Sequence, residues 1–558
     1  MSNKLYYGDN LDVLRKYIKD ETVDLCYIDP PFNSKRNYNQ IYLNQGKEDK
    51  AQSQAFIDTW EWNTRTEKEL NEIYDNEKAL YSKQTIMLMQ GLVNVIDKGS
   101  LMAYLVSMTI RIAEIHRVLK DTGSFYLHCD PTASHYLKLV CDGIFCAKGG
   151  DFKNEIIWRR HYSHNDGYKF GWIHDVLLFY TKSDKYTYNT QFIPYDDEYI
   201  KKNYTLTDDK TGKKYRSVSM NAQGQGEPKY FGNNLLYPPK GTHWRWTQER
   251  INEAINSGII YFTKNGVPRY KQFLENVEGL TVQDTWIDFY SLSSHDKERL
   301  GYPTQKPETL LERIINTSTN KKDVVLDAFC GCGTTIAVAE RLKRTWIGID
   351  ITFQSISLIL HRLEKSFGEN KFQKMDIELN GIPKDIESAI ALANKVDDRT
   401  RKEFEKWCVL TYSKNRAAIN EKKGKDGGID GIAYIQDFKG DKKQEQELKQ
   451  IVFSVKSDLK PKPSYVRDLI GVMQRENAVM GIFITLYEPT KDMIQEAEKQ
   501  GIYENKMFNL EFPKVLIVSV KDILNNHRLN IPKTQEYKVV KSAKYQAYDD
   551  NEQGLLDL

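Results

Sequence analysis

The sequence has 558 residues, of which 40% are hydrophobic and 28% are charged, and its mean hydropathy is −0.61. This length exceeds what one ordinary hydrophobic core can organise, so we expect at least two domains. The net charge of +3 is small for a protein that coats nucleic acid, so any contact with DNA must come from local basic patches.

Residues 1–180 alternate short apolar runs with helical stretches. This alternation predicts an α/β fold in which strands and helices succeed one another. The apolar runs that we expect to form strands are Val23–Ile28, Ser124–His128 and Val176–Tyr180. The pattern stops in residues 181–300, which are rich in Tyr, Asn, Lys and Gly, and we expect a separate, irregular region there.

The alternating pattern returns in residues 301–370, where Val324–Leu326 and Trp346–Ile349 are predicted strands. We expect a helical, charged linker at 371–400, a smaller α/β domain at 401–530 and a polar C-terminal tail at 531–558.

Targeting and redox signals are weak along the whole chain. No apolar run approaches the roughly 20 residues that cross a bilayer, and the first residues lack the apolar core of a signal peptide. The seven cysteines are scattered and odd in number, which argues against a disulfide framework. We therefore expect a cytoplasmic protein with no membrane partner.

The first candidate site is Asp29-Pro30-Pro31-Phe32, which directly follows a predicted strand. Two consecutive prolines stiffen the loop and remove backbone donors. An aromatic amine is a poor nucleophile because its lone pair is delocalised into the ring. If the Asp29 carboxylate and the Pro30 carbonyl accept its hydrogens, the lone pair is freed to attack a methyl donor, while Phe32 stacks on the base. Taken alone, the loop is more simply an ordinary strand-ending turn, and it is the cofactor turn described next that favours the catalytic interpretation.

The second candidate site is the glycine-bearing turn between the strand at Val324 and a helix that starts near Thr334. Gly331 and Gly333 let the backbone turn tightly and approach a ligand. The next strand ends in Asp350, whose carboxylate suits the hydroxyls of a ribose. The cofactor-binding residues predicted in this turn are Asp327, Phe329, Gly331, Gly333 and Thr334, with Asp327 facing a cationic methionine group.

Cys330 and Cys332 also lie in this turn. Two cysteines without partner ligands at suitable spacing make a poor zinc site. We therefore expect no metal here, and we interpret both residues as small neighbours of a cofactor.

These motifs occur in the order of a known family, the beta group of amino-methylating DNA methyltransferases, whose sequence order is circularly permuted. The chain resembles that family over most of residues 1–365. The segments that carry the resemblance are Tyr7–Asn10, Asp29–Phe32, Arg117–Ser124, His128–Asp130, Asn154–Trp158, His174–Leu177, Tyr302–Pro307 and the cofactor turn.

The resemblance implies a Rossmann-like methyltransferase with a mixed sheet, S-adenosylmethionine as cofactor and an inserted target-recognition region. It places Asp9 near the cofactor adenine and Lys306 in the motif before the cofactor turn, which commonly begins with His where this chain has Tyr302. The Asp that begins the catalytic loop implies adenine N6 as the target, since cytosine N4 enzymes more often carry Ser there. N4-cytosine methylation is the alternative.

The segment between His174 and Tyr302 falls where the family keeps target recognition. Its aromatic and basic residues are Trp244, Trp246, Trp286, Lys210, Lys213, Lys214 and Arg216. Such residues suit DNA contacts and the flipping of a target base. A Tyr-rich insertion with its own small core is the alternative.

Residues 401–530 resemble the Mrr-like branch of restriction endonuclease folds, in the segments 426–432, 450–457 and 481–485. In such folds carboxylates hold Mg²⁺ and a Lys assists the attacking water, which points to Asp430 and Lys456. Ser454 replaces an expected metal ligand, for which Glu403 or Glu405 would have to substitute. We expect this domain mainly to bind DNA, with Mg²⁺-dependent cleavage and a structural role as alternatives.

The chain is thus expected to be a site-specific adenine-N6 DNA methyltransferase of a restriction-modification or phage-defence system. Its expected partners are double-stranded DNA and a restriction subunit, and a dimer is compatible with the sequence. The alternatives are a bifunctional enzyme that also cleaves DNA with Mg²⁺, an N4-cytosine methyltransferase and a catalytically idle DNA-binding protein.

Overall fold

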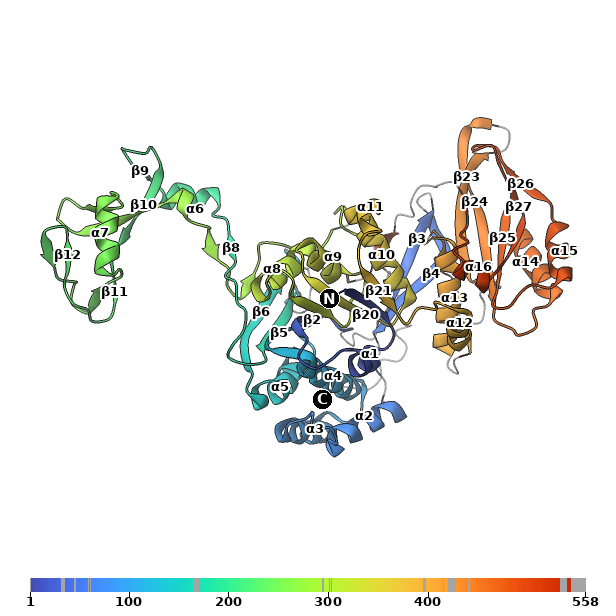
Figure 1. Cartoon of the computed structure of the whole chain (residues 1–558), viewed down its shortest axis with the longest axis horizontal. Coiled ribbons are helices and arrows are strands. Elements are labelled where there is room, and N and C mark those ends of the chain that lie inside the picture. The colour runs from blue at the N-terminus through green and yellow to red at the C-terminus, as the bar shows by residue number, and fades with distance from the viewer. Residues whose placement is uncertain are drawn as a thin grey trace. The chain divides into compact units, whose positions relative to one another are not determined.

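The computed structural model describes residues 2–31, 36–44, 47–58, 60, 62–163, 168, 170–293, 296–300, 302, 304–394, 398–414, 416–419, 428–439, 442–531 and 539–542. They divide into two compact units, Met1–Asn189 with Asp284–Leu558 and Thr190–Gln283. Figure 1 labels the elements of both. No helix within these ranges is long and apolar enough to cross a membrane.

The main sheet of the first unit has nine strands in the described part of the chain, in the order β18-β6-β7-β5-β2-β19-β20-β1-β21. Their bounds are β1 Asn3–Tyr7, β2 Val23–Ile28, β5 Leu119–Cys129, β6 Asp151–Arg159, β7 His174–Thr181, β18 Thr285–Trp286, β19 Val324–Asp327, β20 Thr345–Asp350 and β21 Ile377–Asn380. Strand β7 is antiparallel to β5 and β6, whereas the other neighbours run parallel. The sheet is therefore mixed, as predicted.

Helices cover both faces of this sheet (Figure 1), as α/β folds require to bury them. The helices are α1 Asn10–Tyr17, α2 Thr64–Asp75, α3 Lys83–Ile96, α4 Ser100–Val118, α5 Ser134–Ile144, α8 Glu308–Ser318, α9 Thr334–Arg341, α10 Phe353–Phe367 and α11 Glu369–Phe372, with a 3₁₀ turn at Cys146–Lys148. Helix α4 is apolar almost throughout and nearly all its side chains are buried. It forms the centre of the core with the strands it covers. A further small sheet contains β3 Arg36–Asn44, β4 Lys47–Asp58 and β29 Val539–Ser542.

The second unit, Thr190–Gln283, consists of short strands and two helices around a small core. Its elements are β8 Phe192–Ile193, α6 Asp197–Asn203, β9 Leu206–Thr207, β10 Lys214–Ser219, β11 Asn221–Gln223, β12 Lys229–Phe231, β13 Asn234–Leu236, β14 Thr242–Trp244, α7 Gln248–Asn256, β15 Ile260–Phe262, β16 Pro268–Phe273, a 3₁₀ turn at Leu274–Asn276 and β17 Leu280–Thr281. Phe231, Trp244 and Ile251 are buried in that core. The irregular region is shorter than the predicted 181–300, because Thr285–Trp286 already pairs with β6.

The C-terminal part of the first unit contains a five-stranded sheet in the order β22-β23-β24-β25-β28. Its elements are α12 Ile386–Ala393, α13 Asp398–Tyr412, β22 Ala418–Ile419, β23 Gly431–Lys439, β24 Lys442–Lys456, α14 Pro463–Glu476, β25 Met480–Thr485, α15 Lys491–Glu498, β26 Ile502–Asn505, β27 Leu510–Pro513, β28 Val515–Ser519 and α16 Val520–Leu524.

The segment 371–400, predicted as a linker, is more structured than expected. Strand β21 is an edge strand of the main sheet beside β1, and the buried Ala389 and Leu392 of α12 join the core of the C-terminal domain. The segment is helical in part, as expected, but these residues do not form a separate linker, because short apolar runs between charges supply both an edge strand and a packed helix.

Candidate active site

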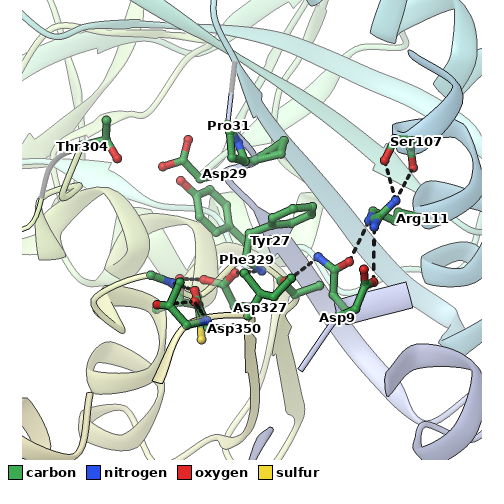
Figure 2. Close-up of a pocket in the computed structure, with 18 of the residues that line it drawn as sticks. Asp9, Tyr27, Asp29, Pro31, Ser107, Arg111, Thr304, Asp327, Phe329 and Asp350 are labelled. Atoms are coloured by element: carbon green, nitrogen blue, oxygen red, sulfur yellow. Dashed lines mark hydrogen bonds and ion pairs between the residues drawn. The ribbon is translucent and has the colours of Figure 1, made fainter. Parts of the chain in front are cut away.

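A cavity of about 530 Å³ opens where β2, β19 and β20 end (Figure 2). These parallel strands are neighbours, so their carboxyl ends meet at one edge of the sheet, the usual ligand site of such folds. The predicted residues that line the cavity are Asp9, Asp29, Pro30, Pro31, Lys306, Asp327, Phe329, Gly331, Thr334 and Asp350. Gly333 is adjacent to the lining but not part of it, and Phe32 lies outside the described residues.

The catalytic loop follows β2 without a break, and its carboxylate is paired. Lys306 Nζ forms an ion pair and hydrogen bond with Asp29 Oδ2. The side chains of Asp29 and Lys306 are 16% and 10% exposed, so the pair lies in a partly desolvated position where a charge-assisted contact is strong. Lys306, predicted as a cofactor residue, thus contacts the catalytic loop.

The glycine turn adopts a backbone that L side chains rarely adopt. Gly331 has φ +48° and Gly333 has φ +73°, both in the left-handed region where glycine carries no steric penalty. A Cβ on Gly331 would lie 3.2 Å from the Tyr302 ring, and one on Gly333 would lie 2.6 Å from Ile359 Cγ1. The Gly331 N–H donates to Asp350 Oδ2 at 2.9 Å, which ties the turn to the end of β20.

Two carboxyl groups lie beside this turn, Asp327 buried and Asp350 half-buried. Asp327 accepts hydrogen bonds from Thr335 Oγ1 at 2.6 Å and from the Phe329 N–H at 3.0 Å, yet burial raises its pKa to about 7. Burial likewise raises the pKa of Asp350 to about 6. A buried carboxyl with a raised pKa gains from a cation or a hydroxyl donor placed against it. Both positions therefore suit a ligand with a positive charge and hydroxyl groups.

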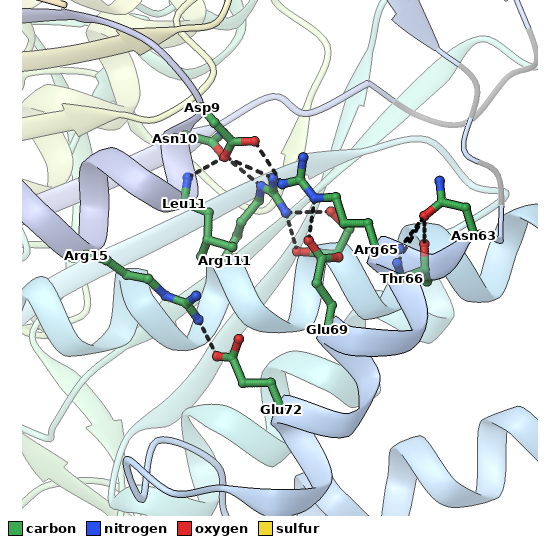
Figure 3. Close-up of polar contacts among 11 residues, drawn as sticks. Asp9, Asn10, Leu11, Arg15, Asn63, Arg65, Thr66, Glu69, Glu72 and Arg111 are labelled. Atoms are coloured by element: carbon green, nitrogen blue, oxygen red, sulfur yellow. Dashed lines mark hydrogen bonds and ion pairs between the residues drawn. The ribbon is translucent and has the colours of Figure 1, made fainter. Parts of the chain in front are cut away.

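Asp9 belongs to a charged network at the other end of the cavity (Figure 3). Its Oδ1 accepts from the Leu11 N–H at 2.9 Å, which caps α1, and lies 3.3 Å from Arg111 Nη2. Its Oδ2 lies 2.9 Å from Arg65 Nη2. Burial favours the neutral acid, but Arg111 and Arg65 hold the pKa of Asp9 below its usual value. Asp9 is therefore an ionised and firmly oriented carboxylate.

Arg111 extends this network to the cofactor turn. Its Nε donates to Asn10 Oδ1 at 2.7 Å, and its Nη1 donates to the Ser107 carbonyl at 3.0 Å. The Asn10 side-chain amide in turn donates to the carbonyl of Ala328 at 2.8 Å. Helices α1 and α4 are thus joined to the end of β19 through one buried guanidinium.

Sequence reasoning did not identify several residues of the cavity wall. They include Tyr27, Trp60, Asn63, Arg65, Thr66, Glu69, Ser107, Arg111 and Thr352. Arg111 had a recognisable signal, because it is an arginine inside a long apolar helix and such a charge must find a partner. The others come from segments whose pattern is that of an ordinary strand, helix or loop.

The two residues predicted for the C-terminal domain lie close together. Asp430 immediately precedes β23, and its Oδ2 accepts from the Val455 N–H at 2.6 Å, next to Lys456 at the end of β24. Asp426 and Gly427 lie outside the described residues. Within the described ranges, no group of three His, Cys, Asp or Glu side chains is arranged to hold a metal ion.

Glu403, considered as a replacement metal ligand, is engaged elsewhere. It is buried on α13, accepts from the Phe353 N–H at 2.9 Å and pairs with Lys406 at 2.7 Å. It therefore binds the first turn of α10, just beyond Asp350. Both of its oxygens have partners here, so its role as a replacement metal ligand stays a prediction.

Family profiles match both parts of the chain. A DNA methylase profile, covering N6 and N4 methyltransferases, matches residues 23–360. A restriction endonuclease profile, of the Mrr catalytic type, matches residues 396–504.

Several curated proteins are similar to the chain. The type II methyltransferase M.EcaI of Enterobacter cloacae is 32% identical over 47% of this chain and 57% of its own length. The StyLTI Mod subunit, of a type III restriction-modification enzyme of Salmonella typhimurium, is 27% identical over 60% of this chain and 49% of its own length. The DNA adenine methyltransferase YhdJ of Escherichia coli is 27% identical over 64% of this chain and 82% of its own length. The chain thus spans about half the length of the first two relatives.

Solved structures give more distant matches. M1.HpyAVI in complex with SAM aligns with 64% of this chain and 98% of its own, at 14% identity and a TM-score of 0.31. The cytosine-N4-specific PvuII DNA methyltransferase aligns with 68% of this chain and 95% of its own, at 13% identity and a TM-score of 0.33. Since the methylase profile covers more than half of the sequence, the chain belongs to the DNA methylase family of N6 and N4 methyltransferases.

Proposed function

We propose that this protein transfers a methyl group from S-adenosylmethionine to N6 of adenine at specific sites in double-stranded DNA. The observation that carries the proposal is that the Asp29-Pro30-Pro31 loop and the glycine turn with Asp327 and Asp350 open into one cavity. One cavity can hold an amine and a methyl donor against each other, and such positioning supplies roughly 7–11 kcal/mol of a reaction barrier.

The cavity residues fit S-adenosylmethionine. Gly331 and Gly333 form a tight left-handed turn beside the cavity, Asp327 can face the cationic methionine group, and Asp350 can accept hydrogen bonds from the ribose hydroxyls. Asp9 would serve the adenine end, with its carboxylate held by two arginines. When bound, S-adenosylmethionine supplies an activated methyl group on a sulfonium.

The chain's own residues would prepare the target amine. The Asp29 oxygen that is not paired with Lys306 can accept one N–H hydrogen, and the Pro30 carbonyl can accept the other. The amine nitrogen then moves towards tetrahedral geometry, and its lone pair becomes available. Lys306 keeps the Asp29 carboxylate in place through their ion pair, so no metal is needed to orient it.

Two features support adenine over cytosine as the target. The catalytic loop begins with Asp, and a family relative that matches 64% of this chain is named a DNA adenine methyltransferase. The unit Thr190–Gln283 would recognise the target sequence; its Tyr237 is exposed, whereas Trp244 belongs to its core. Opening the duplex costs a few kcal/mol, which aromatic and phosphate contacts offset.

The setting we propose is a restriction-modification system in the cytoplasm, with a restriction subunit as partner. The type III Mod relative and the restriction endonuclease profile at 396–504 support this assignment. The C-terminal domain would mainly bind DNA, because Ser454 stands where a metal ligand is expected beside Lys456. Cleavage by this domain is the second candidate function, favoured by the contact of Asp430 with β24.

Two assays distinguish these functions. Unmethylated bacterial DNA is incubated with the protein and S-adenosylmethionine, with and without Mg²⁺, and its nucleosides are analysed by mass spectrometry. N6-methyladenine supports the proposal, whereas N4-methylcytosine assigns the enzyme to the other branch of its family. Mg²⁺-dependent nicking that is abolished by Asp430→Ala would show that the C-terminal domain is a nuclease.

A further inference from the structure

A chain of buried polar side chains runs from the cavity into the core. Tyr27, His128 and Asp175 lie on the neighbouring strands β2, β5 and β7, and each is at most 2% exposed. The Tyr27 hydroxyl lies 2.9 Å from His128 Nδ1, and His128 Nε2 lies 3.1 Å from Asp175 Oδ2. Arg160 Nε lies 3.2 Å from Asp175 Oδ1. None of these residues has a role in the proposed function so far.

The donor and acceptor in each of these hydrogen bonds follow from the charge on Asp175. Burial favours the neutral acid, but His128 and the cations Lys306 and Arg160 hold the pKa of Asp175 below its usual value. An ionised carboxylate only accepts hydrogen bonds, so His128 Nε2 must donate. In a neutral imidazole the other nitrogen then accepts, so the Tyr27 hydroxyl donates to Nδ1. The oxygen of Tyr27 keeps its lone pairs for another donor.

That donor would come from the cavity. Tyr27 is part of the cavity wall, two residues before Asp29, and Figure 2 shows its ring next to Asp29 and Asp327. An amine bound at Asp29 must lose a proton once it has been methylated. A group that accepts this proton needs an oxygen lone pair that faces the bound amine.

We propose that Tyr27 is a catalytic residue whose oxygen takes over, from the Pro30 carbonyl, the N–H proton that the amine loses once it is methylated, and that His128 and Asp175 are positioning residues that turn it into an acceptor. The proposal rests on the proposed amino-methyl transfer. The methylated amine loses one proton: the N–H bond breaks, its electron pair stays on nitrogen, and an O–H bond forms on Tyr27. The original Tyr27 proton passes to His128 Nδ1, and the resulting imidazolium is balanced by the Asp175 carboxylate.

Tyr27 is better suited to pass a proton on to His128 than to act as a base in its ionised form. Burial, followed by the charges of Asp29 and Asp327, raises the pKa of its hydroxyl well above the usual value. Tyr27 would therefore not hold a negative charge, and it would accept one proton only as it gives up another. His128 meets this need because its Nδ1 is directed at the hydroxyl.

The kinetic test is Tyr27→Phe, compared with Tyr126→Phe as a matched control. Tyr126 is an equally buried tyrosine on β5, and its hydroxyl bonds Ser318 Oγ at 2.9 Å outside the cavity wall. Single-turnover methyl transfer to DNA is measured with labelled S-adenosylmethionine, together with the dissociation constants of cofactor and DNA. Tyr27→Phe should slow transfer by about 10²-fold with both dissociation constants unchanged, while Tyr126→Phe should transfer at the wild-type rate.

A second readout does not depend on activity. In protein labelled with ¹⁵N-histidine, the His128 signal, assigned through His128→Gln, should show the proton on Nε2. In Asp175→Asn the amide can donate, so the proton should move to Nδ1 and the transfer rate should fall. Wild-type transfer by Tyr27→Phe, or a proton on Nδ1 in the wild type, would overturn the relay. A wild-type protein that methylates no adenine would overturn the proposed function instead, and the NMR result would still judge the relay.

Discussion

Lys306 forms an ion pair with Asp29, although the two residues are 277 positions apart in the sequence. Lys306 lies just before α8, in the segment that leads to the cofactor turn, whereas Asp29 directly follows β2. The contact thus joins the catalytic loop to the cofactor-binding half of the domain. Both side chains line the same cavity, so the pair acts where the two reactants would meet.

Lys306→Met should slow methyl transfer because it removes the cation that holds the Asp29 carboxylate in place. We expect a loss of at least about tenfold in the single-turnover rate, in the range of one lost charge-assisted hydrogen bond. Lys306→Arg should recover part of the lost rate. Lys120→Met is the matched control, since Lys120 pairs with Asp24 at 2.8 Å away from the cavity wall. Equal rates for Lys306→Met and Lys120→Met would contradict this role.

The affinity for S-adenosylmethionine should rise with pH. Asp327 and Asp350 have pKa values raised by burial to about 7 and about 6, and a cationic ligand favours the ionised form of Asp327. Binding therefore releases a proton at low pH, and affinity climbs until the pH passes about 7. Calorimetry should show at least about a tenfold gain between pH 5.5 and 7.5. Asp327→Asn should bind more weakly with a smaller pH dependence, and a flat wild-type profile would refute this linkage.

Gly333→Ala should destabilise the methyltransferase domain. Its φ of +73° costs an L residue about 1–2 kcal/mol, and the new Cβ would lie 2.6 Å from Ile359 Cγ1. Thermal unfolding should show a lower melting temperature. Gly91→Ala in α3 is the control, because a Cβ there meets nothing within 4 Å and alanine favours a helix by roughly 0.5–1 kcal/mol. Equal melting temperatures for the two variants would count against the tight turn.

Local patterns were sufficient to predict the strands and the cofactor turn. The apolar runs at Val23, Val324 and Trp346 became β2, β19 and β20, and α9 begins at the predicted Thr334. Each of these elements is specified by neighbouring residues: buried strands by continuous apolar runs, and the turn by glycines at left-handed positions. The carboxylates that follow such strands then come together because parallel strands end at one edge.

Contacts between distant segments could not be predicted in the same way. The pairing of Tyr27 with His128 depends on β2 lying beside β5, and the position of Arg111 depends on how α4 packs against α1. Both are outcomes of tertiary packing, which no local window contains. The same reason explains Glu403, whose partner at Phe353 lies in a different domain, and the edge strand β21, whose short sequence resembles a linker.

Under the proposed function, Asp29 activates the amine in a cavity shared with the methyl donor. The most direct test is single-turnover methyl transfer by Asp29→Ala, measured beside the affinity of the same variant for S-adenosylmethionine. Transfer by this variant should fall by at least about 10²-fold, while its cofactor affinity should stay close to the wild-type value. Transfer at the wild-type rate by Asp29→Ala would contradict this role of Asp29.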